Sequence, residues 1–155
     1  MIMKKFYLLI FSLLIMISFN FCHDYTVKKE KFEEQLSKAN AFYKKRNYRS
    51  AFRLFDWLIK KDSLSGEIYY KRGYCKLQIF DPKTSKEDFE NAIRLGYRIK
   101  DSYLNLGVIE CFYNDSLAIK YFDTVLRIDS TNVKAKLYRE EAVKRLNKHS
   151  QTIEL

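Results

Sequence analysis

A pattern that recurs at a nearly constant interval constrains the fold of this chain more than any other sequence feature. Small residues mark the pattern at Ala39, Gly73 and Gly107. Phenylalanines follow the same interval, with the last step shorter by one, at Phe55, Phe89 and Phe122. A unit of about 34 residues cannot bury its apolar face alone, so neighbouring units stack and share a continuous core. The repeat therefore predicts a stack of similar units.

Each unit is predicted to contain two helices. The chain is 47% apolar, and this composition excludes intrinsic disorder. It has only four glycines and one proline, and this scarcity of turn-forming residues disfavours a turn-rich β-sandwich. Apolar residues at spacings of three and four predict helices over 28–46, 48–61, 66–79, 84–95, 100–113 and 116–128, and a last helix over 132–147. Ser63, Ser116 and Ser130 are the predicted N-caps.

The small residues have a physical role, because two antiparallel helices approach closely only where a side chain is small. In the last helix Glu140 stands where Gly73 and Gly107 stand in the earlier units. A charge at that position predicts a capping helix, polar on its outer side, and not a fourth complete unit.

The period, the spacing of small residues before phenylalanine, and the linkers at 61–63 and 128–130 resemble the tetratricopeptide repeat (TPR) family. The chain lacks the family's linker proline, with Ser63 and Ser130 instead, and has Tyr69 and Tyr103 near the position of its tryptophan. The resemblance implies an all-α, right-handed helical-repeat solenoid of about three TPR helix pairs plus a C-terminal capping helix. The expected organisation is a TPR domain over 32–147, preceded by a linker or helix start over 23–31 and followed by a flexible tail over 148–155.

Residues 1–22 are expected to be a signal peptide or membrane anchor. Lys4 and Lys5 precede an apolar run over 6–21, and Cys22 ends it. This arrangement resembles a bacterial lipoprotein signal, in which the cysteine is lipidated, although Phe21 stands where such signals have a small residue. An uncleaved inner-membrane signal anchor and ordinary cleavage are the alternatives. Either tether predicts an exported protein held in the cell envelope, facing the periplasm or the surface.

No residue pattern indicates an enzyme, a cofactor or a metal site. The two histidines, His23 and His149, lie near the ends without a cysteine or serine partner, and the four glycines are isolated rather than grouped to cradle a phosphate. Cys75 and Cys111 are expected to be small buried side chains, and the sequence leaves open whether they pair.

The resemblance to TPR proteins implies a concave groove lined by the first helix of each repeat, suited to a peptide or a helix. The candidate groove residues of this chain are Asn40, Tyr43, Lys44, Tyr70, Tyr74, Gln78, Val108 and Phe112, with Leu36, Leu77 and Leu104 beside them. One TPR subfamily grips a carboxyl-terminal carboxylate there. Asn40 matches that pattern, whereas Leu36, Lys71, Asp101 and Asn105 do not, so a chaperone-tail clamp is not expected. The groove could also be filled by the chain's own amino-terminal segment or last helix.

The net charge of +10 is concentrated in the first repeat, where residues 28–65 carry eleven basic and five acidic side chains. The sequence leaves three explanations for this cluster of positive charge: a solvated helix end, binding to an anionic membrane beside the anchor, or binding to nucleic acid. The cluster consists of Lys44, Lys45, Arg46, Arg49 and Arg53. An exported domain would not meet nucleic acid.

The first functional hypothesis is a membrane-tethered, non-enzymatic adaptor that binds a protein or peptide, without a small-molecule substrate. The alternative is a structural subunit of an obligate envelope complex.

Overall fold

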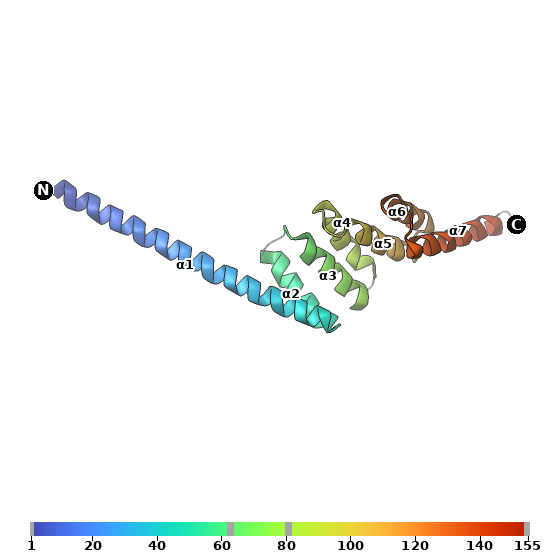
Figure 1. Ribbon diagram of the computed structural model, residues 1–155, viewed down its shortest axis with the longest axis horizontal. Coiled ribbons are helices and arrows are strands. Elements are labelled where there is room, and N and C mark those ends of the chain that lie inside the picture. The colour runs from blue at the N-terminus through green and yellow to red at the C-terminus, as the bar shows by residue number, and fades with distance from the viewer. Residues whose placement is uncertain (1, 62–63, 80–81, 154–155) are drawn as a thin grey trace.

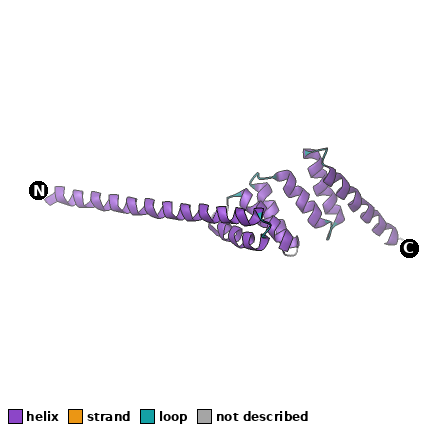
Figure 2. Cartoon of the chain, turned by 60° about the horizontal axis from the view of Figure 1, so that its bottom comes forward, coloured by secondary structure: helices purple, strands orange, loops and turns teal. Residues whose placement is uncertain are grey.

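The computed structural model describes the backbone of residues 2–61, 64–79 and 82–153, and the side chains of Met16 and of residues 24–61, 64–79 and 82–148. Within these residues the chain is helical, with short connections (Figure 2). The elements are α1 (Ile2–Lys44), α2 (Tyr48–Lys61), α3 (Gly66–Ile79), a 3-10 turn η1 (Pro82–Ser85), α4 (Lys86–Arg94), α5 (Ile99–Glu110), α6 (Asp115–Ile128) and α7 (Val133–Ile153).

The helices pack in sequence order, each against the next one along the chain. The three predicted pairs are therefore confirmed as α1–α2, α3–α4 and α5–α6, and α7 closes the stack against α6. Three successive core clusters lie between them, centred on Phe55, Phe89 and Phe122, each of which is fully buried. The all-α repeat fold predicted from the sequence is correct.

The end helices are longer than predicted. Helix α1 is one continuous helix of 43 residues that projects far beyond the solenoid (Figure 1). It includes 23–31, where the sequence predicted a linker or a helix start, and α7 runs six residues past its predicted end at 147. No glycine or proline occurs before Gly66, so nothing in the sequence of α1 interrupts its hydrogen-bonded turns.

Close helix packing explains the repeated small residues. A Cβ placed on Gly107 would lie 2.5 Å from the Phe122 ring, and one on Gly73 would lie 2.9 Å from Cβ of Asp88 and 3.4 Å from the Phe89 ring. Ala39, at the same position in the first pair, is fully buried. Each first helix is thus pressed against its partner at the position that the repeat register marks.

Asparagine caps two of the helices for which the sequence predicted serine. The Asn114 side chain accepts from the Leu117 amide at 3.0 Å and starts α6, so Ser116 lies inside that helix. Asn132 accepts from the Ala135 amide at 3.0 Å just before α7, so the prediction of Ser130 is also wrong. Asparagine is at least as strong an N-cap as serine. Ser63 lies outside the described residues.

The outer side of α7 is less polar than a terminal cap requires. Ala135 and Ala142 are buried against α6, and Glu140 is exposed and paired with Lys144. Val133 and Leu137 are nevertheless 76% and 59% exposed. The prediction of a charged outer position at Glu140 is correct, but aliphatic surface lies beside it.

Replacing Gly107 with alanine should lower the free energy of unfolding by about 1–2 kcal/mol, because the added methyl group overlaps the Phe122 ring. Chemical denaturation of the wild type, Gly107→Ala, Phe122→Leu and the double variant measures this, and the double variant should recover part of the loss. Helix propensity alone favours alanine by about 1 kcal/mol. A gain in stability would therefore contradict the close approach.

Candidate functional site

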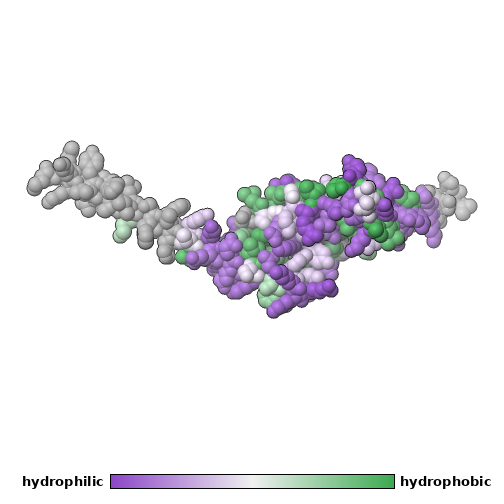
Figure 3. Space-filling view, viewed as in Figure 1, coloured by the Kyte–Doolittle hydropathy of each residue, from purple (hydrophilic) through white to green (hydrophobic). Residues whose placement is uncertain are grey.

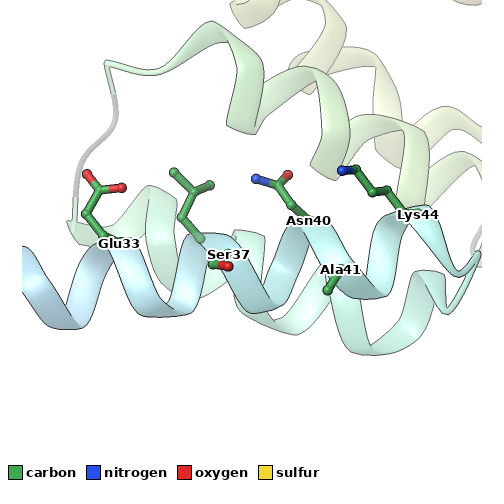
Figure 4. Close-up of a pocket in the computed structure, with 6 residues that line it drawn as sticks. Glu33, Ser37, Asn40, Ala41 and Lys44 are labelled. Atoms are coloured by element: carbon green, nitrogen blue, oxygen red, sulfur yellow. The ribbon is translucent and has the colours of Figure 1, made fainter.

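A shallow hollow on α1 contains part of the predicted groove. It has a volume of about 480 Å³ and is lined by Glu33, Leu36, Ser37, Asn40, Ala41 and Lys44. Glu33, Asn40 and Lys44 extend from the same side of the helix (Figure 4). A carboxylate, an apolar residue, an amide and a cation thus follow one another along a helix face of about 16 Å.

The Asn40 amide is tied to the neighbouring repeat. Its oxygen accepts a hydrogen bond of 2.7 Å from the Lys71 amino group, which also pairs with Glu67 on α3. The same amino group lies 6.0 Å from the centre of the Tyr43 ring. These contacts fix the side of the hollow that faces α3.

Tyr43 and Tyr74 form an aromatic cluster between the first two repeats. Their ring centres are 5.8 Å apart, and both rings pack edge-on against Tyr48. Tyr43 also contacts Phe55 of the core, and its burial raises the pKa of its phenol. Much of the surface of these two rings is therefore used in holding the repeats together.

Tyr70 lies still deeper, with 6% of its surface exposed. Its ring packs against Phe89 and Tyr97 at 5.7 and 5.9 Å, and the Arg98 guanidinium lies 4.9 Å above it. Burial raises the pKa of the Tyr70 phenol. Little of this side chain is left for contact with a partner.

The remaining candidates lie apart from the hollow on α1. Gln78 is exposed, and Val108 is half-buried against the third core cluster. Phe112 is 71% exposed and lines a second hollow of about 460 Å³ together with Arg145 and Leu146. The Arg145 guanidinium pairs with Asp115 at 2.6 Å, which joins α7 to the start of α6.

The predicted groove set therefore divides into four groups. Leu36, Asn40 and Lys44 lie at the first hollow, the three tyrosines pack in the core clusters between helices, Phe112 lies at the second hollow, and Gln78 and Val108 line neither of these two hollows. Leu137 was missed. It continues the row of Leu36, Tyr70 and Leu104 at nearly the same interval, so extending the repeat register into the last helix would have found it. Figure 3 shows hydrophobic patches among hydrophilic surface along this solenoid.

The basic residues 44–46, 49 and 53 form the tip where α1 turns into α2, and all five are exposed. Along the straight helix α1, Lys44 lies about 35 Å from Phe21, where the apolar run ends. This exceeds the Debye length of about 8–10 Å several-fold. The tip therefore does not lie beside a membrane that holds an upright α1, contrary to one of the explanations considered from the sequence.

A buried ion-pair network joins the first and second repeats behind the groove. The Arg72 guanidinium binds both carboxylate oxygens of Asp88, at 2.6 and 3.0 Å, and one oxygen of Asp56 at 2.8 Å. Lys76 approaches the same Asp88 at 3.0 Å, and the Asp88 side chain is fully buried. Burial opposes ionisation of Asp56, but hydrogen bonds from Lys60 and Arg72 outweigh it and lower the pKa.

Cys75 and Cys111 are both free thiols. Burial raises the pKa of Cys75 to about 12 and also raises that of the less buried Cys111. Cys22 lies outside the residues whose side chains the structure describes, so its lipidation stays a prediction.

In the described part of the chain no three His, Cys, Asp or Glu side chains gather closely enough to hold a metal ion. Among the same residues no helix is long and apolar enough to cross a membrane. The apolar run over 6–21 falls, apart from Met16, outside the described side chains.

Comparison with solved structures identifies the architecture. The TPR domain of Arabidopsis OM64 superposes with a TM-score of 0.66 at 22% identity, covering 74% of this chain and 96% of that one. The first TPR domain of Spaghetti (RPAP3), bound to the HSP90 peptide SRMEEVD, gives a TM-score of 0.67 at 17% identity over 76% and 94%. The TPR domain of P58(IPK) gives 0.73 at 17% identity over 83% and 36%. The fold is that of a TPR solenoid.

Comparison of the sequence with known proteins gives less information about this chain than comparison of the structures. No protein-family model matches the chain. Stress-induced-phosphoprotein 1 of Caenorhabditis elegans is 22% identical over 111 residues, which are 71% of this chain and 35% of that protein. The chain thus spans about a third of the curated relative that it matches, and the likenesses establish the fold alone.

Removing the Asp88 carboxylate should lower the free energy of unfolding by about 3 kcal/mol or more, because it leaves two cations facing a buried space. Asp88→Ala can be compared with Glu140→Ala, which removes an exposed pair and should not measurably change stability. Equal midpoints for both variants in urea would contradict a stabilising role of the network.

Cys75 should resist alkylation in the folded protein, because a thiol with a pKa of about 12 is about one part in ten thousand thiolate at pH 8. Mass spectrometry after brief iodoacetamide treatment should find Cys111 modified well before Cys75. Denaturant should abolish the difference. Faster labelling of Cys75 in the native state would contradict its burial.

Proposed function

We propose that this chain is a non-enzymatic interaction protein that binds a peptide or helix of a partner protein at the groove side of its TPR solenoid. The hollow beside Leu36, Asn40 and Lys44 carries this proposal, because it offers apolar contact, an amide and a cation on one continuous helix face. Such a mixture of apolar anchors and a few polar groups is typical of peptide-recognition grooves.

The solved structures with the same fold support the proposal in one respect. Two of them, both TPR domains of RPAP3, hold short chaperone peptides, SRMEEVD and SGPTIEEVD. This chain departs from a clamp for such tails at Leu36, where the hollow is apolar, and at Asp101, whose carboxylate pairs with Arg98. An internal or helical segment is therefore the proposed ligand.

The amino-terminal segment is proposed to hold the solenoid at a membrane of the bacterial cell envelope, either through lipidated Cys22 or as an uncleaved anchor. The basic flank and the apolar run over 6–21 support this part of the proposal. In both forms residue 22 marks the boundary between the tether and the solenoid-bearing part of α1.

Lys44 lines the first hollow and Phe112 the second, so the two residues together probe a ligand that spans the predicted groove. Tyr74 is not a suitable probe, because its ring supports the aromatic cluster between repeats. Peptides selected by phage display against the detergent-solubilised full chain would be titrated against Lys44→Glu and Phe112→Ala. Each variant should weaken binding about fivefold to tenfold, which corresponds to about 1–1.4 kcal/mol. Both side chains are exposed, so the melting temperature should not change.

Lys120→Glu and Ile128→Ala are the matched controls, because both residues are exposed on α6, the second helix of its pair. They should leave the affinity unchanged. Equal losses in all four variants, or no loss in the groove variants, would contradict binding at the groove.

The alternative, a subunit of an obligate complex, is favoured by one observation: Val133, Leu137, Phe112 and Tyr113 leave aliphatic and aromatic surface exposed towards the carboxyl-terminal end. An obligate subunit should self-associate or lose stability without its partner. A concentration-independent monomer in analytical ultracentrifugation would support the adaptor instead.

A further inference from the structure

A hollow lined by aromatic rings and lysines lies where α1 leaves the solenoid. It has a volume of about 670 Å³ and lies between α1 and the end of α2. Its lining includes Tyr25, Phe32 and Trp57 together with Lys28, Lys29 and Lys61. We call these six residues the collar. The groove proposed above does not use any of them.

The continuity of α1 fixes the position of the collar relative to the tether. Tyr25 lies about 6 Å beyond Phe21 along the helix, and Lys29 about 12 Å beyond it. Helix α2 packs against α1 and brings Trp57 and Lys61 to the same level. Two helices therefore present aromatic and basic groups at the end of the solenoid that faces the apolar run.

The charge around the collar is predominantly positive. Lys28, Lys29, Lys31 and Lys61 line the hollow against one carboxylate, Glu33. Asp24 offsets Lys28 through an exposed pair, but the ion pairs among the described residues do not include Lys29, Lys31 or Lys61. These three cations are thus available to an anionic surface.

The aromatic residues have the arrangement expected at a lipid interface. Tyr25 is 63% exposed, and the Lys61 amino group lies 5.8 Å from the centre of the Trp57 ring. Leu64, in the connection that follows Lys61, is 76% exposed. Tryptophan and tyrosine concentrate at the level of lipid headgroups, and lysines extend their amino groups towards the phosphates.

We infer that the collar is a membrane-docking surface that rests on the anionic headgroups of the bilayer holding the tether. This inference rests on the proposed tether, and it holds for both of its forms, because the lipidated and the uncleaved chain each meet the bilayer near residue 22. Docking sets the tilt of α1 and keeps the basic tip and the groove turned towards the compartment beyond the membrane. The collar lies within about one to two Debye lengths of the headgroups, whereas the tip at Lys44 lies about 35 Å away.

Trp57 is the only tryptophan of the chain, so its fluorescence reports on the collar directly. The full chain would be reconstituted into vesicles of phosphatidylcholine, with and without phosphatidylglycerol, that carry a headgroup nitroxide quencher. Quenching of Trp57 should be at least twofold stronger when phosphatidylglycerol is present. Lys29→Glu combined with Lys31→Glu should abolish the difference.

Lys120→Glu combined with Lys136→Glu is the charge-matched control, because both lysines are exposed on the distant helices α6 and α7. That variant should be quenched like the wild type, and circular dichroism should show both variants folded.

Flotation of the vesicles distinguishes failure of the proposed tether from failure of the collar alone. A chain that does not float with vesicles would contradict the tether and the collar together. A chain that floats, but whose Trp57 is not quenched or is quenched equally in both lipids, would contradict the collar alone.

Discussion

The close approach of paired helices at one small residue is the constraint on which the rest of the structure depends. At Gly107 and Gly73 a single added carbon would collide with the facing helix, and the phenylalanine rings opposite are fully buried. This contact fixes how deeply each first helix sits against its partner. Because it repeats at nearly constant spacing, it also fixes which side of α1, α3 and α5 is left for a ligand.

The sequence predicted this part of the fold well because the contact leaves a strong signal. A Cβ at Gly73 would collide with Cβ of Asp88 and one at Gly107 with the Phe122 ring, and the fully buried Ala39 occupies the same register position in the first pair. The continuity of α1 was harder to predict, because its apolar and amphipathic halves have different patterns and suggest two separate segments. The helix caps at Asn114 and Asn132 were missed because neighbouring serines offer the same hydrogen-bond chemistry.

The candidate site could be predicted only in part, for a related reason. The register places Tyr43, Tyr70 and Tyr74 on the inner helices but does not say whether a ring points into the groove or between repeats. Burial of a large ring against Tyr48, Phe55 or Phe89 stabilises the fold more than exposure of that ring to solvent would. The three tyrosine rings therefore pack against these neighbours. Small and charged residues such as Asn40 and Lys44 have no such gain and remain at the surface hollow.

A continuous α1 connects these features into one functional arrangement. It carries the proposed tether at one end, the collar that we propose docks on the membrane beside it, and residues of the predicted groove at the other end. Hydrogen–deuterium exchange of the full chain in lipid vesicles tests this continuity most directly. Amides of residues 24–31 should exchange within about tenfold of those of 33–44, as expected for one helix whose free end frays only modestly. Exchange of 24–31 at the rate of an unstructured peptide would show a flexible linker and contradict the account.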